Sequence, residues 1–264
     1  MPGAAVPTFD GLVEVSVGSA THCGHRRRVN EDSLLVLPHV YVVADGMGGH
    51  AAGDQASAIL VEEMRRLAEG AVEAVDVSDV LEQANVRVRA LADGGAGTTV
   101  AAAIGVEHDG APYWLVANLG DSRTYQLSEG RLQQVSVDHS VVQELMDRGV
   151  LDAAGAKRHP QRHVITRAVG GPEAMEADYW LLPVVDGDRL VLCSDGLTGE
   201  VDDERIAAVL LAHADPQQAA DALVEQALDG GGRDNVTVLV IDARSRRTHP
   251  GVEDTQPRSQ VGAP

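Results

Sequence analysis

Short apolar, β-branched runs recur along the chain, and most of them end in turns rich in Gly or Asp. Runs of this kind predict β-strands. They cover residues 13–17, 34–37, 40–44, 98–106, 113–118, 123–127, 132–136, 179–182, 189–193 and 236–241. Ser128-Glu129-Gly130 lies between the runs 123–127 and 132–136 and predicts a hairpin turn.

Helical periodicity, with apolar residues three and four positions apart, is clearest at residues 52–69 and 77–91. Ser78 is a candidate N-cap for the second of these helices. The other helical patterns are at 139–148, 203–212 and 216–228. Strands thus come in runs and helices in pairs, which favours antiparallel sheets covered by helix pairs over a regular βα alternation.

Two stretches show neither kind of periodicity. Residues 149–163 are polar and poor in strand-forming residues, so we expect a surface excursion there. Residues 243–264 are rich in Arg, Pro and Ser, and we expect them to form a disordered tail. The pattern therefore predicts one domain over residues 10–242, followed by that tail.

The composition permits a sizeable core, because 44% of the residues are hydrophobic. A net charge of −19 argues against nucleic acid and against an anionic membrane surface as partners. The two cysteines, Cys23 and Cys193, have no CxxC partner, and no signal sequence or membrane-spanning apolar run is evident. We therefore expect reduced cysteines and a cytoplasmic protein.

Three aspartates share a context at the end of an apolar strand. Asp45 and Asp195 each follow a strand and precede a glycine, whereas Asp234 lies between a glycine run and a strand. A strand that is apolar throughout is buried on both faces, so its end has a fixed position. Ionised carboxylates that share a partly dry site repel one another, and a hard divalent cation such as Mg²⁺ or Mn²⁺ removes that cost.

An Asp-Gly pair after a strand is also an ordinary turn, and for any single aspartate this is the simpler interpretation. The repetition of the context, together with Gly120-Asp121-Ser122, favours a cation site. Upstream, the arginines at 26–28 precede Glu31 and Asp32. These residues form either a solvated charged loop or a place where a guanidinium grips phosphate while an acid supports a cation.

Six motifs follow one another along the chain: Arg27-Arg28-Val29-Asn30-Glu31-Asp32, Asp45-Gly46-Met47-Gly48-Gly49-His50, Gly97-Thr98-Thr99, Gly120-Asp121-Ser122-Arg123, Ser194-Asp195-Gly196-Leu197 and Asp234-Asn235-Val236-Thr237. In this order they resemble the metal-dependent protein phosphatases of the 2C type, the PPM family, in its bacterial serine/threonine form. The resemblance implies an α+β fold, a four-layer β-sandwich of two mainly antiparallel sheets flanked by helix pairs.

The resemblance also implies a ligand set for two divalent cations, Mn²⁺ or Mg²⁺, and for a third, weaker one. Asp45 would bridge the first two, and Gly46 would add its backbone carbonyl to one of them. Asp195 and Asp234 would complete the other. Asp121 matches the position that holds the third metal in bacterial members.

The remaining assignments concern the substrate and the outer ligands. Arg27 is the best match for the phosphate-binding arginine, and Glu31 or Asp32 would act mostly in the outer shell of the second metal. Asn235 either orients Asp234 or serves the turn. Met47 takes the place of the histidine that acts as general acid in many eukaryotic members, so the general acid stays unassigned.

These assignments predict hydrolysis of phosphoserine and phosphothreonine in one step, by a hydroxide that bridges two metals. The substrates would be phosphorylated proteins, with Ser/Thr kinases suggested by analogy, and a monomer is expected. Residues 137–171 would contain the flap that shapes substrate entry.

Three other functions fit less well. A cysteine phosphatase would need Arg where Val29 stands in the loop after Cys23, and Cys193 has no adjacent basic residue to activate it. A dinucleotide site at residues 46–51 lacks the βαβ unit. A phosphoprotein-binding pseudophosphatase is disfavoured because all the expected metal ligands are present.

Overall fold

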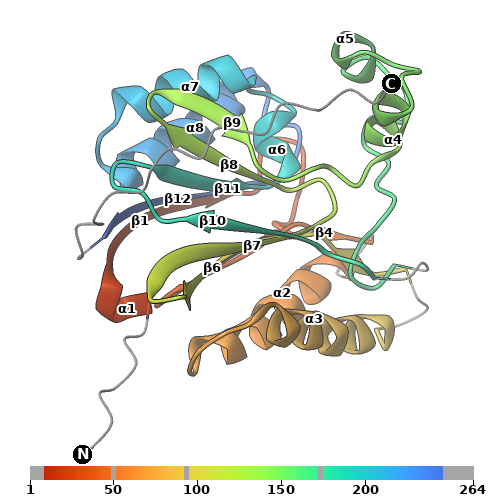
Figure 1. Ribbon diagram of the computed structural model, residues 1–264. Coiled ribbons are helices and arrows are strands. Elements are labelled where there is room, and N and C mark those ends of the chain that lie inside the picture. Colours follow the sequence, from red (N-terminus) through yellow and green to blue (C-terminus); the bar gives the residue numbers. More distant parts are fainter. Residues whose placement is uncertain (1–8, 49–51, 92–94, 172–174, 246–264) are drawn as a thin grey trace, which may run out of the picture.

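Two five-stranded antiparallel sheets form the centre of the computed structural model, which describes residues 9–48, 52–91, 95–171 and 175–245 (Figure 1). The first sheet has the order β1 (Val13–His22), β12 (Val236–Ser245), β11 (Arg189–Cys193), β8 (Arg123–Ser128) and β9 (Arg131–Gln134). The second has the order β10 (Asp178–Pro183), β7 (Ala111–Leu119), β6 (Val100–His108), β3 (Val40–Ala44) and β2 (Ser33–Leu37). A small ribbon pairs β4 (Gly46–Met47) with β5 (Gly97–Thr98).

Helix pairs cover the outer face of each sheet (Figure 1). The second sheet is covered by α2 (Gly53–Met64), its 3-10 continuation η1 (Arg65–Ala68) and α3 (Ala74–Arg89). The first sheet is covered by α7 (Asp203–Ala212) and α8 (Pro216–Gly230). Shorter helices are α1 (Phe9–Leu12), α4 (Val141–Asp147), α5 (Ala153–Ala156) and α6 (Asp195–Thr198). The predicted four-layer α+β sandwich is confirmed.

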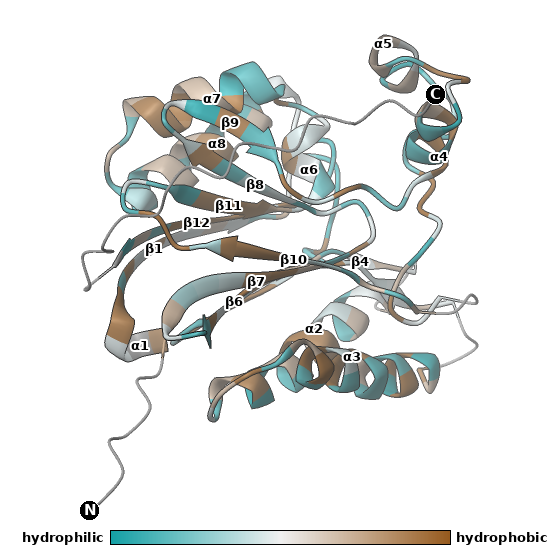
Figure 2. Cartoon of the chain, in the orientation of Figure 1, coloured by the Kyte–Doolittle hydropathy of each residue, from teal (hydrophilic) through white to brown (hydrophobic). Residues whose placement is uncertain are grey.

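Three apolar clusters correspond to the three interfaces between these layers. One lies between α2, α3 and the second sheet, one lies between the first sheet and α7 and α8, and the third joins the two sheets. The helices turn their apolar sides toward the sheets (Figure 2). In the part of the chain that the structure describes, no helix is long and apolar enough to span a membrane.

The predicted strand 236–241 is too short, because β12 continues to Ser245. Its last residues pair with the start of β1, where Val13 faces Ser245 and Val15 faces Ala243. Residues 243–245 therefore belong to the sheet and not to the predicted tail. The rest of the predicted tail, 246–264, lies outside the described residues.

Two further predictions needed correction. Helix α3 begins at Ala74, where the Glu73 N–H donates to the Asp76 carboxylate at 2.8 Å, so Ser78 is not the cap. The run 98–106 breaks at Thr99, because its N–H leaves the ladder to donate to the Asp45 carbonyl at 2.9 Å. The hairpin turn is confirmed, with positive φ at Glu129 and Gly130.

Candidate active site

Asp195 and Asp234 lie at adjoining strand ends of the first sheet. Cys193, the last residue of β11, pairs with Val238 of β12, and the Ser194 N–H donates to the Thr237 carbonyl at 3.0 Å. Since the strands are antiparallel, the end of β11 and the start of β12 meet at one edge. The carboxylates of Asp195 and Asp234 therefore share this edge.

The second sheet brings Asp32 and Asp45 to the same end of the sandwich. Ser33 of β2 pairs with Ala44 of β3, so Asp32 immediately precedes this pair and Asp45 immediately follows it. Asp121 lies in the turn between β7 and β8, where the chain crosses from the second sheet to the first. Five separate segments thus bring aspartates to the same end of the sandwich.

Thr99 ties Asp45 to the Asp121 turn. Its hydroxyl accepts a hydrogen bond from the Asp45 N–H at 3.0 Å and lies 2.7 Å from the hydroxyl of Ser122. Thr98 adds a hydroxyl that donates to the Asp45 carbonyl at 3.0 Å. The backbone of Asp45 is therefore fixed on both sides, which agrees with the fixed strand end expected from the sequence.

Two glycines permit the close backbone approach on which this arrangement depends. A Cβ on Gly46 would lie 2.5 Å from the Glu31 carbonyl oxygen and against the carbonyl of Gly53. A Cβ on Gly196 would overlap the carbonyl of Asn235, next to Asp234. Because the obstacles are backbone atoms, only glycine is compatible with both contacts.

One carboxylate oxygen of Asp32 is hydrogen-bonded and the other is not. Its Oδ2 accepts hydrogen bonds from the hydroxyls of Ser194, at 2.8 Å, and Thr237, at 2.7 Å. Its Oδ1 is buried and has no hydrogen-bond partner among the described residues. A buried carboxylate oxygen without a donor is costly, and a cation or the water around it supplies what is missing.

The pKa values show how strongly these carboxylates interact. Burial raises the pKa of Asp45 well above its ordinary value, and the charges of Asp32, Asp195, Asp121 and Asp234 raise it further. Burial also raises the pKa of Asp32 to about 7, against the hydrogen bonds from Thr237 and Ser194. The pKa of Asp121 is likewise raised to about 7, by burial and then by the charge of Asp195. The cluster thus carries more negative charge than its surroundings compensate.

Asn235 holds the loop between β1 and β2 onto the start of β12. Its Oδ1 accepts from the Glu31 N–H at 2.9 Å, and its Nδ2 donates to the carbonyls of Cys23, at 3.0 Å, and Val29, at 2.9 Å. Its own N–H donates to Asp234 Oδ1 at 2.8 Å. Asn235 therefore positions the loop that carries Arg27 as well as Asp234.

Arg27 reaches the cluster from this loop. Its Nη2 lies 2.7 Å from Asp234 Oδ2, and its side chain is 48% exposed. Arg26 and Arg28 are exposed and make no ion pair within the described ranges. Of these three arginines, only Arg27 contacts a carboxylate of the cluster among the described residues.

The donor set fits hard divalent cations, although no three His, Cys, Asp or Glu side chains of the described residues are close enough to form one ion-binding group. A cation of the Mg²⁺ type needs only one or two carboxylates, since carbonyls and waters complete its octahedron. The free Oδ1 of Asp32 and the mutual charge on Asp45 and its neighbours provide oxygens of this kind.

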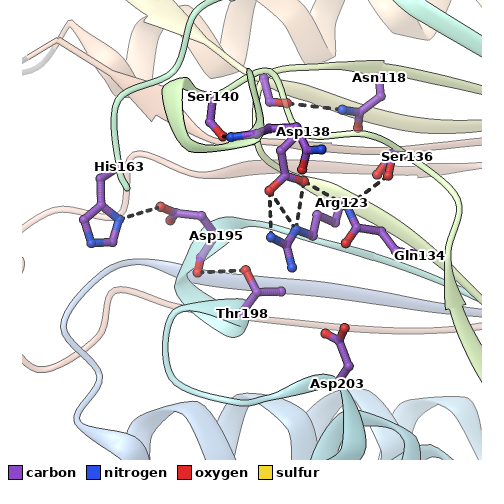
Figure 3. Close-up of polar contacts among 12 residues, drawn as sticks. Asn118, Arg123, Gln134, Ser136, Asp138, Ser140, His163, Asp195, Thr198 and Asp203 are labelled. Carbon is purple, nitrogen blue, oxygen red and sulfur yellow. Dashed lines mark hydrogen bonds and ion pairs between the residues drawn. The ribbon is translucent and has the colours of Figure 1, made fainter. Parts of the chain in front are cut away.

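Sequence reasoning missed the ion pair beneath Asp121. Arg123 donates to both carboxylate oxygens of Asp138, with Nη2 to Oδ2 at 2.6 Å and Nε to Oδ1 at 2.9 Å (Figure 3). His139 is fully buried; its Nδ1 accepts from the Gly120 N–H at 3.1 Å, and its Nε2 lies 3.2 Å from Asp178. The Asp-His-Ser sequence at 138–140 could have suggested this support, but nothing local marks the histidine as buried.

His163 ends the polar stretch 149–163 for which a surface excursion was predicted, and its side chain is 59% exposed. It nevertheless points toward Asp195, with Nδ1 3.8 Å from Oδ2 (Figure 3). This contact raises the pKa of His163. The segment that follows α5 therefore reaches the edge of the carboxylate cluster.

Comparison with known sequences places this arrangement in a family context. A sequence model described as protein phosphatase 2C matches residues 21–228. The chain is 32% identical over 239 residues to the serine/threonine phosphatase stp of Listeria welshimeri, with 84% of this chain and 93% of that protein covered. It is 37% identical over 229 residues to the serine/threonine protein phosphatase PstP of Mycobacterium tuberculosis, with 82% of this chain and 42% of that protein covered.

Solved structures agree with the sequence matches. The crystal structure of the M. tuberculosis serine/threonine phosphatase PstP/Ppp has a TM-score of 0.80 at 34% identity and covers 88% of this chain and 98% of that one. The catalytic domain of PstP in complex with two manganese ions has a TM-score of 0.78 at 33% identity and covers 88% and 99%.

Proposed function

The chain belongs to the protein phosphatase 2C family, and on that premise we propose that its aspartate cluster holds the divalent cations used to hydrolyse phosphoserine and phosphothreonine in proteins. It is a metal-dependent serine/threonine phosphatase. The observation that carries the assignment of the site is the meeting of Asp32, Asp45, Asp121 and Asp195 from separate segments, with the raised pKa of Asp45 as its electrostatic sign.

In this proposal each side chain has a distinct role. Asp45 would hold the two main cations, and Gly46 would contribute its backbone carbonyl, since close packing against Glu31 fixes the backbone there. Asp195 and Asp234 complete the second set of ligands. Asp32 and Glu31 act through the surrounding water, consistent with the free Oδ1 of Asp32.

The chemistry divides between the cations and the chain. Bound cations supply positive charge that activates water for in-line attack on phosphorus near neutral pH. Arg27 leaves its contact with Asp234 and binds the non-bridging phosphate oxygens, which a guanidinium does with two parallel hydrogen bonds. Asn235 keeps the Arg27 loop against Asp234 through its three backbone contacts.

Several finer assignments belong to the same proposal. Mn²⁺ or Mg²⁺ occupies the two main positions, and Asp121 holds a third, weaker ion beside Asp195. The substrates are phosphorylated proteins, Ser/Thr kinases among them, and the enzyme works as a monomer in cytoplasmic signalling. Two free cysteines, Cys23 and Cys193, support a reducing compartment.

The test is turnover by the purified protein of a phosphoserine peptide and of p-nitrophenyl phosphate. We expect activity with Mn²⁺ and none after chelation. Asp45→Asn should lose at least about a hundredfold in turnover, because a bridging charge is removed, and calorimetry should show weakened Mn²⁺ binding. Wild-type turnover and affinity in this variant would refute the assignment of Asp45.

A further inference from the structure

The basic residues of this acidic chain are unevenly distributed. The sequence has 21 Lys and Arg against 40 Asp and Glu, and its one lysine is Lys157. Lys157, Arg158 and Arg162 lie within six positions, directly after α5, and all three are exposed. We call them the flap cations.

The flap cations are not used to hold the fold together. None of them makes an ion pair with a carboxylate in the described part of the chain. Structural arginines behave differently: Arg189 is buried against Asp242 at 2.6 Å, and Arg123 is bound by Asp138. The charges after α5 are therefore free to meet a group from another molecule.

The segment that carries the flap cations leads directly to the carboxylate cluster. His163 follows Arg162 in the chain, and its Nδ1 lies 3.8 Å from Asp195 Oδ2. The Thr166 N–H donates to the His139 carbonyl at 2.8 Å, and Val169 bridges Thr98. These contacts anchor residues 163–169 to the end of the sandwich, from which α4 and α5 project (Figure 1).

The chain as a whole is strongly acidic, with a net charge of −19. Such a surface repels acidic polypeptides at long range, and it would leave an acidic substrate poorly bound unless cations stood near the site. Lys and Arg bind carboxylates through charge-assisted hydrogen bonds. The flap cations are exposed and form no ion pair within the described residues, so they have this capacity next to the segment that reaches Asp195.

We propose that Lys157, Arg158 and Arg162 form a docking surface for Asp- and Glu-rich stretches that flank the phosphorylated residue of the substrate. The proposal rests on the phosphatase function of the neighbouring aspartate cluster. It assigns a substrate class: phosphoserine or phosphothreonine in an acidic context is the preferred target.

The experiment compares two phosphoserine peptides of equal length, one with Asp and Glu around the phosphoserine and one with Ser and Gln. The readout is the ratio of kcat/KM for the two peptides within each variant, so that any loss of folded enzyme cancels. Wild type should prefer the acidic peptide by about tenfold, through KM, as expected for a few exposed ion pairs. Added NaCl should reduce the preference.

The double variant Lys157→Glu, Arg158→Glu should abolish or invert this ratio. Arg131→Glu is the matched control. Arg131 is also exposed and makes no ion pair with any described residue, but it starts β9, opposite Ser128 at the far end of the sheet from Asp195. It should keep the wild-type ratio. A third peptide, with a second phosphoserine in place of the acidic residues, tests phosphate as the alternative anion.

The outcomes separate this proposal from the function on which it rests. No preference in wild type, a preference that survives in the double variant, or a preference for the doubly phosphorylated peptide alone would each overturn carboxylate docking. If neither peptide nor p-nitrophenyl phosphate is hydrolysed with Mn²⁺, the proposed function itself fails.

Discussion

Replacing Asn235 with Ala removes the side chain that fastens the Arg27 loop to β12. Three hydrogen bonds are lost, to the backbone of Glu31, Cys23 and Val29. Each bond contributes about 1 kcal/mol, so we expect a loss of about 3 kcal/mol in the free energy of unfolding. For a chain of this size that corresponds to a fall in Tm of roughly 6–12 °C.

The variant should also be impaired in function while folded. The loop carries Arg27 and Asp32, so we expect its release to lower Mn²⁺ affinity by about tenfold or more. The N–H of residue 235 that donates to Asp234 is kept in alanine, so the loss is due to the loop. Thermal unfolding measures the first effect, and Mn²⁺ calorimetry at a temperature well below Tm measures the second.

Arg189→Gln provides a matched loss of stability far from the site. Arg189 starts β11, at the end opposite Asp195, and its guanidinium binds Asp242 and the carbonyls of Leu210, His213 and Ala214. It should unfold at least as readily as Asn235→Ala but keep wild-type Mn²⁺ affinity per folded molecule. Equal affinity in both variants would refute the positioning role of Asn235.

Three other predictions follow from the same structure. Burial raises the pKa of Asp32 and of Asp121 to about 7, so in chelated protein the folded state binds protons that the unfolded state does not. The denaturant midpoint should therefore rise as pH falls from about 7 toward 5, and Mn²⁺ should remove this trend. A midpoint that does not change with pH in chelated protein would contradict this prediction. Iodoacetamide should leave turnover intact while chelators abolish it, because burial raises the pKa of Cys193 to about 12; inactivation by thiol alkylation would revive cysteine chemistry. Truncation after Ser245 should preserve melting temperature and p-nitrophenyl phosphate turnover, whereas truncation after residue 242, the predicted domain end, should destabilise the protein by removing pairs between β12 and β1.

The sequence was most informative where a strand is apolar at every position. Val40–Ala44 is buried throughout, and its boundaries and the Asp45 that follows it were predicted correctly. The same holds for Arg189–Cys193 before Asp195. A short run that is buried on both faces and ends in a turn can be recognised as a strand from neighbouring residues alone. The position of the aspartate that follows it can therefore be predicted as well.

Long-range pairing explains most of what was missed. The second half of β1, up to His22, is polar and partly exposed, and it becomes a strand only by pairing with β12 more than 200 positions away. The contacts of Asn235 with Cys23 and Val29 are equally distant in sequence, and the approach of His163 to Asp195 joins two segments separated by several elements. No local pattern contains these contacts.

We propose that Asp45, Asp195 and Asp234 bind divalent cations at one end of the sandwich. Anomalous diffraction from crystals of the wild-type protein grown with Mn²⁺ tests it most directly. We expect at least two manganese peaks, with carboxylate oxygens of Asp45 about 2 Å from both, as for ligands of small hard cations. Manganese bound elsewhere, or an Asp45 carboxylate that contacts none of the peaks, would contradict the account.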